Sequence, residues 1–281
     1  MHPEIFQSPI TEKEELLPGF FYLTIESPVL AKRSVPGQFV MVQVTNAKDP
    51  LLRRPFSLCS AADGKVGILF QVKGRGTAIM SGWEPGESIN IMGPLGNGFG
   101  VHQSCPAAYL VAGGIGIAPL LFLSTFLVSA DSGIAVKIFM GGRSAGEVSL
   151  LSRFDLSACD VFFATDDGSK GFHGLVTDLF DDYVTTDHGF LRGNSIIAGC
   201  GPLPMLQTLS RIASREESAC QLSLEAHMAC GVGACLGCVT ATKQENGFSY
   251  KRTCVEGPVF SGSDIDWDHM QLPVCRSAAL R

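Results

Sequence analysis

The sequence has few charged residues and no block of one sign. Lysine, arginine, aspartate and glutamate make up 17% of the 281 residues, and the formal net charge is −6. The chain therefore lacks the clustered cations that nucleic acids and anionic membrane surfaces require. It also lacks low-complexity tracts and internal repeats. With 46% apolar residues, it is expected to be a soluble globular protein long enough for two domains, each with its own core.

A secretory signal is also missing. The first residues, MHPEIFQSPITEKEELLPGF, have neither the basic start nor the apolar run of an export signal. We therefore expect a cytoplasmic protein, whose ten cysteines lie in a reducing compartment where structural disulfides are rare.

One uncharged stretch, residues 107–130, is long enough to span a bilayer. Glycines and Pro119 interrupt it near the middle, which is typical of a buried strand that feeds a helix. We expect no membrane span.

The pattern of secondary structure changes along the chain. Up to about residue 100, short runs rich in valine, isoleucine and aromatic residues alternate with turns, which predicts an antiparallel barrel or sandwich. From about 105 to 225, apolar strands alternate with helical stretches, which predicts a parallel sheet covered by helices on both faces. After about 226 come a cysteine-rich segment, a polar hairpin-like piece and a tail.

Two glycine-containing turns fall on the predicted parallel sheet. GGIGIAPL (113–120) follows one strand and opens a helix, and AGCGPLPM (198–205) ends another. Exposed backbone N–H groups at such turns attract a pyrophosphate, and open parallel sheets bind ligands at this edge. Each turn alone could be an ordinary strand-to-helix connection, but together they favour a nucleotide site.

Two motifs in the first domain suggest a second ligand. RRPFSL (53–58) offers a cation, a flat ring and a hydroxyl, and KGRGT (73–77) offers backbone N–H groups and a hydroxyl to phosphate. Taken singly, each motif has an ordinary structural explanation: Arg54 as a surface cation, Phe56 as a core residue, and Gly74 and Gly76 as part of a turn.

The cysteines of ACGVGACLGC (229–238) stand out most. With Cys254 they form the spacing C-x4-C-x2-C-x15-C, the plant-type arrangement of [2Fe–2S] ligands, here Cys230, Cys235, Cys238 and Cys254. The alternative is zinc, although zinc ribbons usually present two C-x2-C pairs. The remaining cysteines are expected to be packing or surface thiols; they are Cys59, Cys105, Cys159, Cys220 and Cys275.

The order RPFS, GxGT, GGIGIAPL and CGP resembles the ferredoxin–NADP reductase superfamily over residues ~5–220. EAHMACGVGACLGC (225–238) and TCVEGPVF (253–260) are similar to the electron-transfer subunits of heteromeric NAD-dependent dihydroorotate dehydrogenases. The resemblance implies an FAD-binding β-barrel at 1–102, an NAD(P)-binding α/β domain at 103–223, and a [2Fe–2S] segment with a tail at 224–281.

The resemblance also implies roles for individual residues. Arg54 would hold the flavin pyrophosphate, Phe56 would pack on the isoalloxazine ring, Ser57 would bond near its N5, and Gly76 and Thr77 would line the phosphates. The other implied flavin-binding residues are Pro55, Gln71, Val72 and Lys73. The implied NAD(H)-binding residues are Gly113, Gly114, Gly116, Pro119, Cys200 and Gly201, and the run at 165–174 would border their cleft.

The implied activity is electron transfer between NAD(H), as co-substrate, and a partner. The partner would be an FMN-containing catalytic subunit in a heterotetramer that oxidises dihydroorotate in pyrimidine synthesis. No general acid, base or nucleophile is expected here, and no catalytic residue is assigned. Glu225 and Met228 receive no ligand role.

Other readings stay open. The same architecture occurs in NAD(P)H–ferredoxin reductases, sulfide dehydrogenase subunits and hydrogenase diaphorase subunits, and a zinc-stabilised binding module is a further alternative. The choice between NAD and NADP is open too, because Arg143 could meet a 2′-phosphate.

Overall fold

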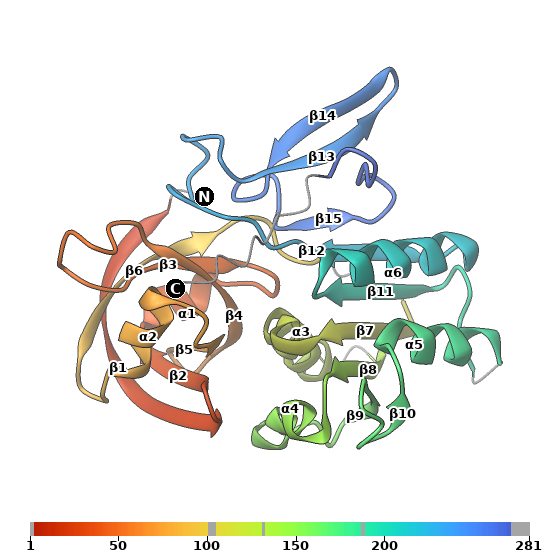
Figure 1. The fold of residues 1–281 in the computed structure, drawn as a ribbon, viewed down its shortest axis with the longest axis horizontal. Coiled ribbons are helices and arrows are strands. Elements are labelled where there is room, and N and C mark those ends of the chain that lie inside the picture. Colours follow the sequence, from red (N-terminus) through yellow and green to blue (C-terminus); the bar gives the residue numbers. More distant parts are fainter. Residues whose placement is uncertain (1–2, 101–104, 131–132, 187–188, 271–281) are drawn as a thin grey trace, which may run out of the picture.

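The computed structural model describes residues 3–100, 105–130, 133–186 and 189–270. Figure 1 shows two lobes side by side, an N-terminal barrel and a sheet with helices, with a β-hairpin above their junction. The predicted boundary at 102/103 lies outside the described residues, and Cys275 does as well.

The N-terminal lobe is a closed barrel in the order β1-β2-β5-β4-β3-β6, and all its strand pairs are antiparallel. This confirms the barrel. Its strands are β1 (Glu4–Leu17), β2 (Phe20–Glu26), β3 (Phe39–Gln43), β4 (Arg54–Ala62), β5 (Lys65–Gln71) and β6 (Ser88–Leu95). Two short helices join it, α1 (Pro28–Arg33) and α2 (Arg75–Ser81).

The second lobe is a seven-stranded sheet in the order β10-β9-β8-β7-β11-β12-β15, parallel except for β15. The predicted parallel sheet is thus confirmed. Its strands are β7 (Ala107–Gly113), β8 (Ala135–Gly142), β9 (Cys159–Thr165), β10 (Phe172–His173), β11 (Ser195–Cys200), β12 (Ala219–Ser223) and β15 (Val259–Ser261). Its helices are η1 (Gly114–Gly116), α3 (Ile117–Ser129), α4 (Ala145–Val148), η2 (Ser149–Arg153), α5 (Val176–Thr185) and α6 (Leu203–Arg215).

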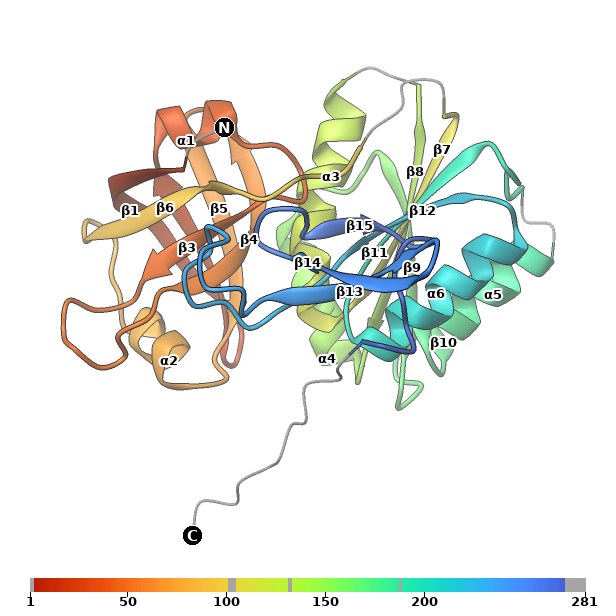
Figure 2. The ribbon, with the colours of Figure 1, turned by 90° about the horizontal axis from the view of Figure 1, so that it is seen from above.

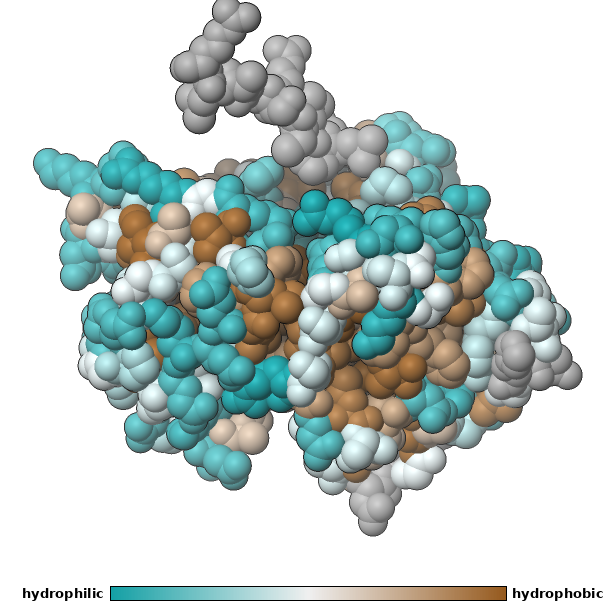
Figure 3. All heavy atoms as spheres, turned by 60° about the horizontal axis from the view of Figure 1, so that its bottom comes forward, coloured by the Kyte–Doolittle hydropathy of each residue, from teal (hydrophilic) through white to brown (hydrophobic). Residues whose placement is uncertain are grey.

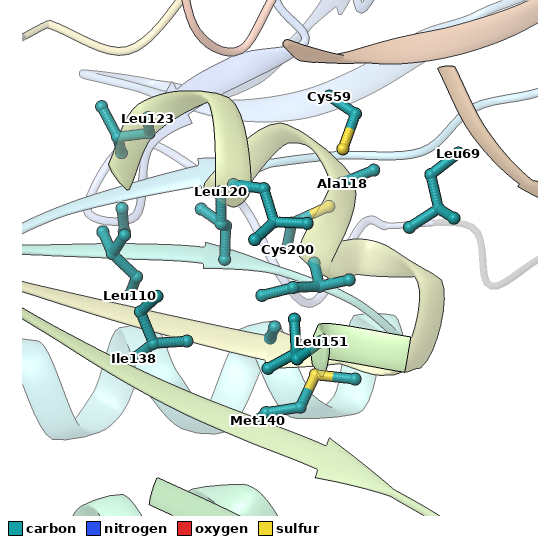
Figure 4. Close-up of a cluster of buried hydrophobic side chains, with 14 of the residues drawn as sticks. Cys59, Leu69, Leu110, Ala118, Leu120, Leu123, Ile138, Met140, Leu151 and Cys200 are labelled. Atoms are coloured by element: carbon teal, nitrogen blue, oxygen red, sulfur yellow. The ribbon is translucent and has the colours of Figure 1, made fainter. Parts of the chain in front are cut away.

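The side chains of the central strand β7 point alternately to the two faces of the sheet, which explains why helices cover both faces. Ala108, Leu110 and Ala112 enter one core, which includes α3 and η2, whereas Tyr109 and Val111 enter the core under α5 and α6. Successive strand residues point to opposite faces, so an apolar strand feeds both cores. Figure 4 shows the first core, in which Cys59 of the barrel lies close to α3. The apolar helix α3 is therefore buried between the lobes (Figure 2).

No described helix is long and apolar enough to cross a membrane. The uncharged stretch 107–130 forms β7, η1 and α3, as its glycines predicted.

The C-terminal segment contacts both lobes. The hairpin β13 (Val239–Gln244) and β14 (Gly247–Arg252) confirms the polar hairpin-like piece, and β15 then pairs antiparallel with β12. Near the barrel, the Asn97 side chain donates hydrogen bonds to the carbonyls of Val255 and Glu256, both at 3.1 Å. The segment is therefore fixed across the junction.

Candidate functional site

The larger of two adjoining clefts, with a volume of about 720 Å³, lies at the carboxyl ends of the parallel strands. Gly113 and Gly114 reach it from β7, Gly141 and Gly142 from β8, and Gly201 from β11. This is the edge at which open α/β sheets bind ligands. Its position and glycine lining suit an extended dinucleotide.

The two glycine turns interlock at this edge. A Cβ atom at Gly116 would lie 2.3 Å from the Cys200 carbonyl oxygen, and one at Gly113 would lie 2.8 Å from Pro202 Cδ. Gly116 thus keeps the turns in contact without lining the cleft, and Pro119 is buried within α3. Cys200 is also buried; burial and the nearby Glu225 carboxylate raise the pKa of its thiol.

The second cleft, of about 280 Å³, lies between the barrel and the junction. It brings together most of the barrel residues predicted from the motifs, namely Pro55, Phe56, Ser57, Gln71, Lys73 and Thr77. The Phe56 and Phe70 rings meet edge to face, with centroids 6.0 Å apart, and both line the cleft. An aromatic wall next to a hydroxyl and a lysine suits a flat heterocycle with polar edges. Val72 instead packs on the barrel core.

The two adjacent arginines have different environments. Arg53 donates to the backbone carbonyls of Met41 and Asn90 and to the side chains of Gln43 and Asn90. Desolvation lowers the pKa of Arg53. The Arg53 side chain ties β3 and β6 to the start of β4. Arg54 donates only to backbone carbonyls in the contacts described and remains half-buried. It is the arginine of the pair that can meet a ligand.

Arg54 lies against α2 because residue 76 is glycine. A Cβ at Gly76 would lie 3.1 Å from Arg54 Nε. Thr77 Oγ1 accepts hydrogen bonds from the N–H groups of Lys73 and Gly74 and donates to the Gly74 carbonyl. The 73–77 loop is therefore closed by Thr77 beside the Arg54 side chain.

The two clefts share a wall formed by Gln71, Lys73, Ile115 and Glu225. Ile115 and Glu225 were missed from the sequence. Glu225 is exposed, yet it lines both clefts. The sequence could have indicated Glu225 through its position just after a strand that ends at the ligand-binding edge. That strand, β12, was not predicted from the sequence. Figure 3 shows apolar side chains gathered where the lobes meet.

The four predicted cysteine ligands come together in two pairs. The thiols of Cys230 and Cys235 are neighbours, those of Cys238 and Cys254 are neighbours, and Cys254 also interacts with Cys230. The hairpin creates the second pair because its register places Val239 opposite Arg252, and the Thr253 N–H donates to the Cys238 carbonyl at 2.6 Å. Within the described ranges, no group of three or more cysteine, histidine, aspartate or glutamate side chains is arranged to hold a metal ion.

Two pairs suit a two-iron cluster, in which each iron takes two protein ligands. The loop also directs backbone N–H groups at sulfur. Partial burial by itself raises the pKa of Cys230, but hydrogen bonds from the N–H groups of Val232, Cys235 and Ala234 lower it to about 7. Gly231 and Gly233, with φ of +72° and +79°, supply turns that side chains rarely permit. The donor set therefore fits an iron–sulfur cluster.

The cysteine loop has an inner and an outer side. Cys238 and Cys254 are buried in a small core with Phe39, Met41 and Leu95. Cys235 is exposed, and Leu236 beside it is 63% exposed.

The inner side adjoins the smaller cleft. Phe39, Ala226 and Met228 line that cleft and also belong to, or pack on, the core of Cys238 and Cys254. One chain of contacts therefore runs from the larger cleft, through the smaller cleft, to the cysteine loop.

A barrel with an aromatic cleft, joined to a parallel α/β domain with a glycine-lined cleft, defines a flavin-dependent NAD(P)H reductase fold. The solved structure of the NADH-dependent reduced ferredoxin–NADP oxidoreductase matches with a TM-score of 0.81 and 28% identity, covering 94% of this chain and 91% of that one. A ferredoxin NADP+ reductase from Neisseria gonorrhoeae matches with a TM-score of 0.62 and 15% identity, covering 75% and 91%, and shows the fold alone.

Sequence comparison is more specific. Residues 225–266 match the family described as the iron-sulfur cluster binding domain of dihydroorotate dehydrogenase B. The electron transfer subunit of dihydroorotate dehydrogenase B (NAD(+)) from Desulforamulus reducens is 36% identical, over 94% of this chain and 99% of the relative. The corresponding subunit from Caldanaerobacter subterraneus is 38% identical, over 83% and 88%. The chain belongs to the family of electron transfer subunits of NAD-dependent dihydroorotate dehydrogenase B.

Proposed function

We propose that this chain carries electrons between NAD(H) and a partner dihydroorotate dehydrogenase subunit, with FAD and a [2Fe–2S] cluster as its resident groups. Flavin supplies the exchange between two-electron and one-electron chemistry, and the cluster carries single electrons. The protein contributes placement and electrostatics, and no side chain acts as acid, base or nucleophile.

The observation that carries this proposal is the order of the three sites. The nucleotide cleft shares a wall with the aromatic cleft, and Phe39, Ala226 and Met228 connect the aromatic cleft to Cys238 and Cys254. A hydride donor, a flavin that releases electrons one at a time and a single-electron carrier need this order. Hydride transfer requires contact between nicotinamide and flavin, and single-electron transfer requires the flavin and the carrier to be near each other.

Individual roles follow from the clefts. Thr77 of the smaller cleft, with Arg54 and Gly76 beside it, would hold the flavin phosphates. Phe56 would pack on the ring system, and Ser57 would face its polar edge. Residues Gly113 to Ile115, with Gly201, would receive the dinucleotide pyrophosphate through backbone N–H groups.

We further propose NAD as the preferred nucleotide. Glu147 and Asp166 line the cleft where β8 and β9 end, and Glu147 accepts hydrogen bonds from the Arg143 backbone at 2.8 Å and from its side chain at 3.4 Å. Carboxylates suit ribose hydroxyls and repel a 2′-phosphate, and Arg143 is already paired with one of them.

The partner would dock at the outer side of the cysteine loop. Cys235 is exposed there together with the apolar side chains of Val232 and Leu236. Relatives are named electron transfer subunits of dihydroorotate dehydrogenase B, which supports a separate catalytic partner subunit. We propose that this partner carries FMN and that the complex is a heterotetramer. The proposed setting is cytoplasmic pyrimidine synthesis, with no nucleic acid or membrane partner.

Co-expression with a catalytic dihydroorotate dehydrogenase subunit tests the proposal. The purified complex should reduce NAD+ on addition of dihydroorotate, while either subunit alone should not. Reduction of ferredoxin by NAD(P)H, without NAD+ reduction by dihydroorotate, would instead support a ferredoxin reductase.

A further inference from the structure

Arg252 lies between the two parts of the chain that carry the cysteine ligands. It ends β14, opposite Val239 and two residues before Cys254. Its Nη1 donates to the Gly233 carbonyl in the cysteine loop at 3.4 Å, and a Cβ at Gly233 would lie 3.1 Å from that nitrogen. The guanidinium therefore packs on the loop close to the ligand sulfurs.

Glu256 holds this guanidinium from the other side. Arg252 Nε lies 3.1 Å from both carboxylate oxygens, and the Arg252 backbone N–H donates to Oε2 at 2.6 Å. The Arg252 guanidinium thus contacts the Gly233 carbonyl of the cysteine loop and the Glu256 carboxylate, and the hairpin places it two residues before Cys254. A fixed pair of opposite charges therefore lies beside the buried half of the cysteine site.

We infer that Arg252 raises the reduction potential of the group bound by the four cysteines and that Glu256 lowers it. Reduction adds one electron, and no proton accompanies it because arginine stays protonated throughout. A cation nearby favours the more negative reduced form, and an anion disfavours it, in line with the effect of local charge on cluster potentials. This inference rests on the cluster of the proposed function, but on neither the partner nor the substrate.

The test compares Arg252→Gln and Glu256→Gln in the full chain loaded anaerobically with iron, sulfide and FAD. The midpoint potential is measured by a redox titration followed by electron paramagnetic resonance. Arg252→Gln should shift it negative, with about a tenfold lower ratio of reduced to oxidised cluster at a fixed potential, which corresponds to about 59 mV. Glu256→Gln should shift it positive.

Lys251→Gln is the matched control, because it removes the same charge from the opposite face of β14. It should leave the midpoint unchanged, and Arg252→Lys should keep most of the wild-type value. Shifts of the same sign in Arg252→Gln and Glu256→Gln, or no shift in either, would overturn the inference. If Arg252→Gln fails to assemble a cluster, the sign of the Glu256→Gln shift decides. A wild-type chain that binds only zinc would refute the proposed function itself.

Discussion

Replacing Gly116 with alanine should push apart the two turns that line the nucleotide cleft. The backbone angles of Gly116, φ −60° and ψ −9°, suit any residue, so the cost is purely steric. The new Cβ would lie 2.3 Å from the carbonyl oxygen and 2.6 Å from the carbonyl carbon of Cys200, and 2.8 Å from the nitrogen of Gly201. All three are backbone atoms, which cannot rotate away.

The size of the effect follows from these distances. A carbon–oxygen contact is ordinarily at least about 3.3 Å, so one turn must move by about 1 Å. Overpacking of this kind costs about 1–3 kcal/mol. We therefore expect the free energy of unfolding of Gly116→Ala to fall by about 2 kcal/mol, measured by urea denaturation. The Kd for NADH should rise about tenfold, equivalent to about 1.4 kcal/mol. It is measured by calorimetry on the FAD-loaded chain after anaerobic reduction with dithionite, so that NADH binds without reacting.

Gly82→Ala is the matched control. Gly82 has an ordinary φ of −88°, and its added Cβ would meet nothing nearer than the Ile79 carbonyl oxygen at 3.4 Å. This change should alter stability by less than about 1 kcal/mol and leave NADH binding intact. If Gly116→Ala keeps both wild-type stability and wild-type affinity, the contact between the turns does not shape the cleft.

Three further outcomes are expected. Cys235→Ser should abolish electron passage to the partner while NADH oxidation by two-electron dyes persists; equal loss of both would mean that the cysteines mainly support folding. Asp166→Ser should lower the ratio of the NADPH dissociation constant to the NADH dissociation constant severalfold. An unchanged ratio would mean that Asp166 does not determine the choice of nucleotide. Burial first, then nearby Cys59, raises the pKa of Tyr22 from 10.0 to about 12, so the folded state retains a proton that the unfolded state loses. Stability should therefore fall between about pH 10 and 12, and less steeply in Tyr22→Phe, as urea titrations at each pH would show.

The local pattern of apolar, polar and glycine residues was enough to predict most of the fold. The strand at 107–113 and the helix after it could be predicted because an uncharged run interrupted by glycines has few other solutions. The hairpin at 239–252 was also visible. In contrast, β15 has only three residues, and it exists because the edge strand β12 offers unpaired backbone groups. Such a strand has no signal of its own in the sequence.

The site was predictable where spacing carries the chemistry. Local sequence places Cys230, Cys235 and Cys238 on one loop, whereas Cys254 joins them only through the hairpin register. The family resemblance assigned the flavin role to Arg54, but the sequence did not predict what Arg53 does. Its hydrogen bonds to β3 and β6 depend on contacts between strands that are distant in the sequence.

The role of Glu225 was likewise not predicted, because its signal depended on β12, a strand that was not recognised from the sequence. Its neighbours in the chain suggest a solvated side chain, and it is exposed. Only the junction of the lobes puts it on the wall shared by both clefts. Residues of this kind depend on domain packing, which a motif does not encode.

An anaerobic rapid-mixing experiment tests the central claim most directly. The FAD- and iron-loaded chain, without a partner, is mixed with NADH and followed by absorbance, and quenched samples are examined by electron paramagnetic resonance. The flavin absorbance should bleach first, and a [2Fe–2S] signal should then appear in the same molecules. A bleached flavin with no cluster signal, in protein whose iron and sulfide content is complete, would contradict the proposed route between the sites.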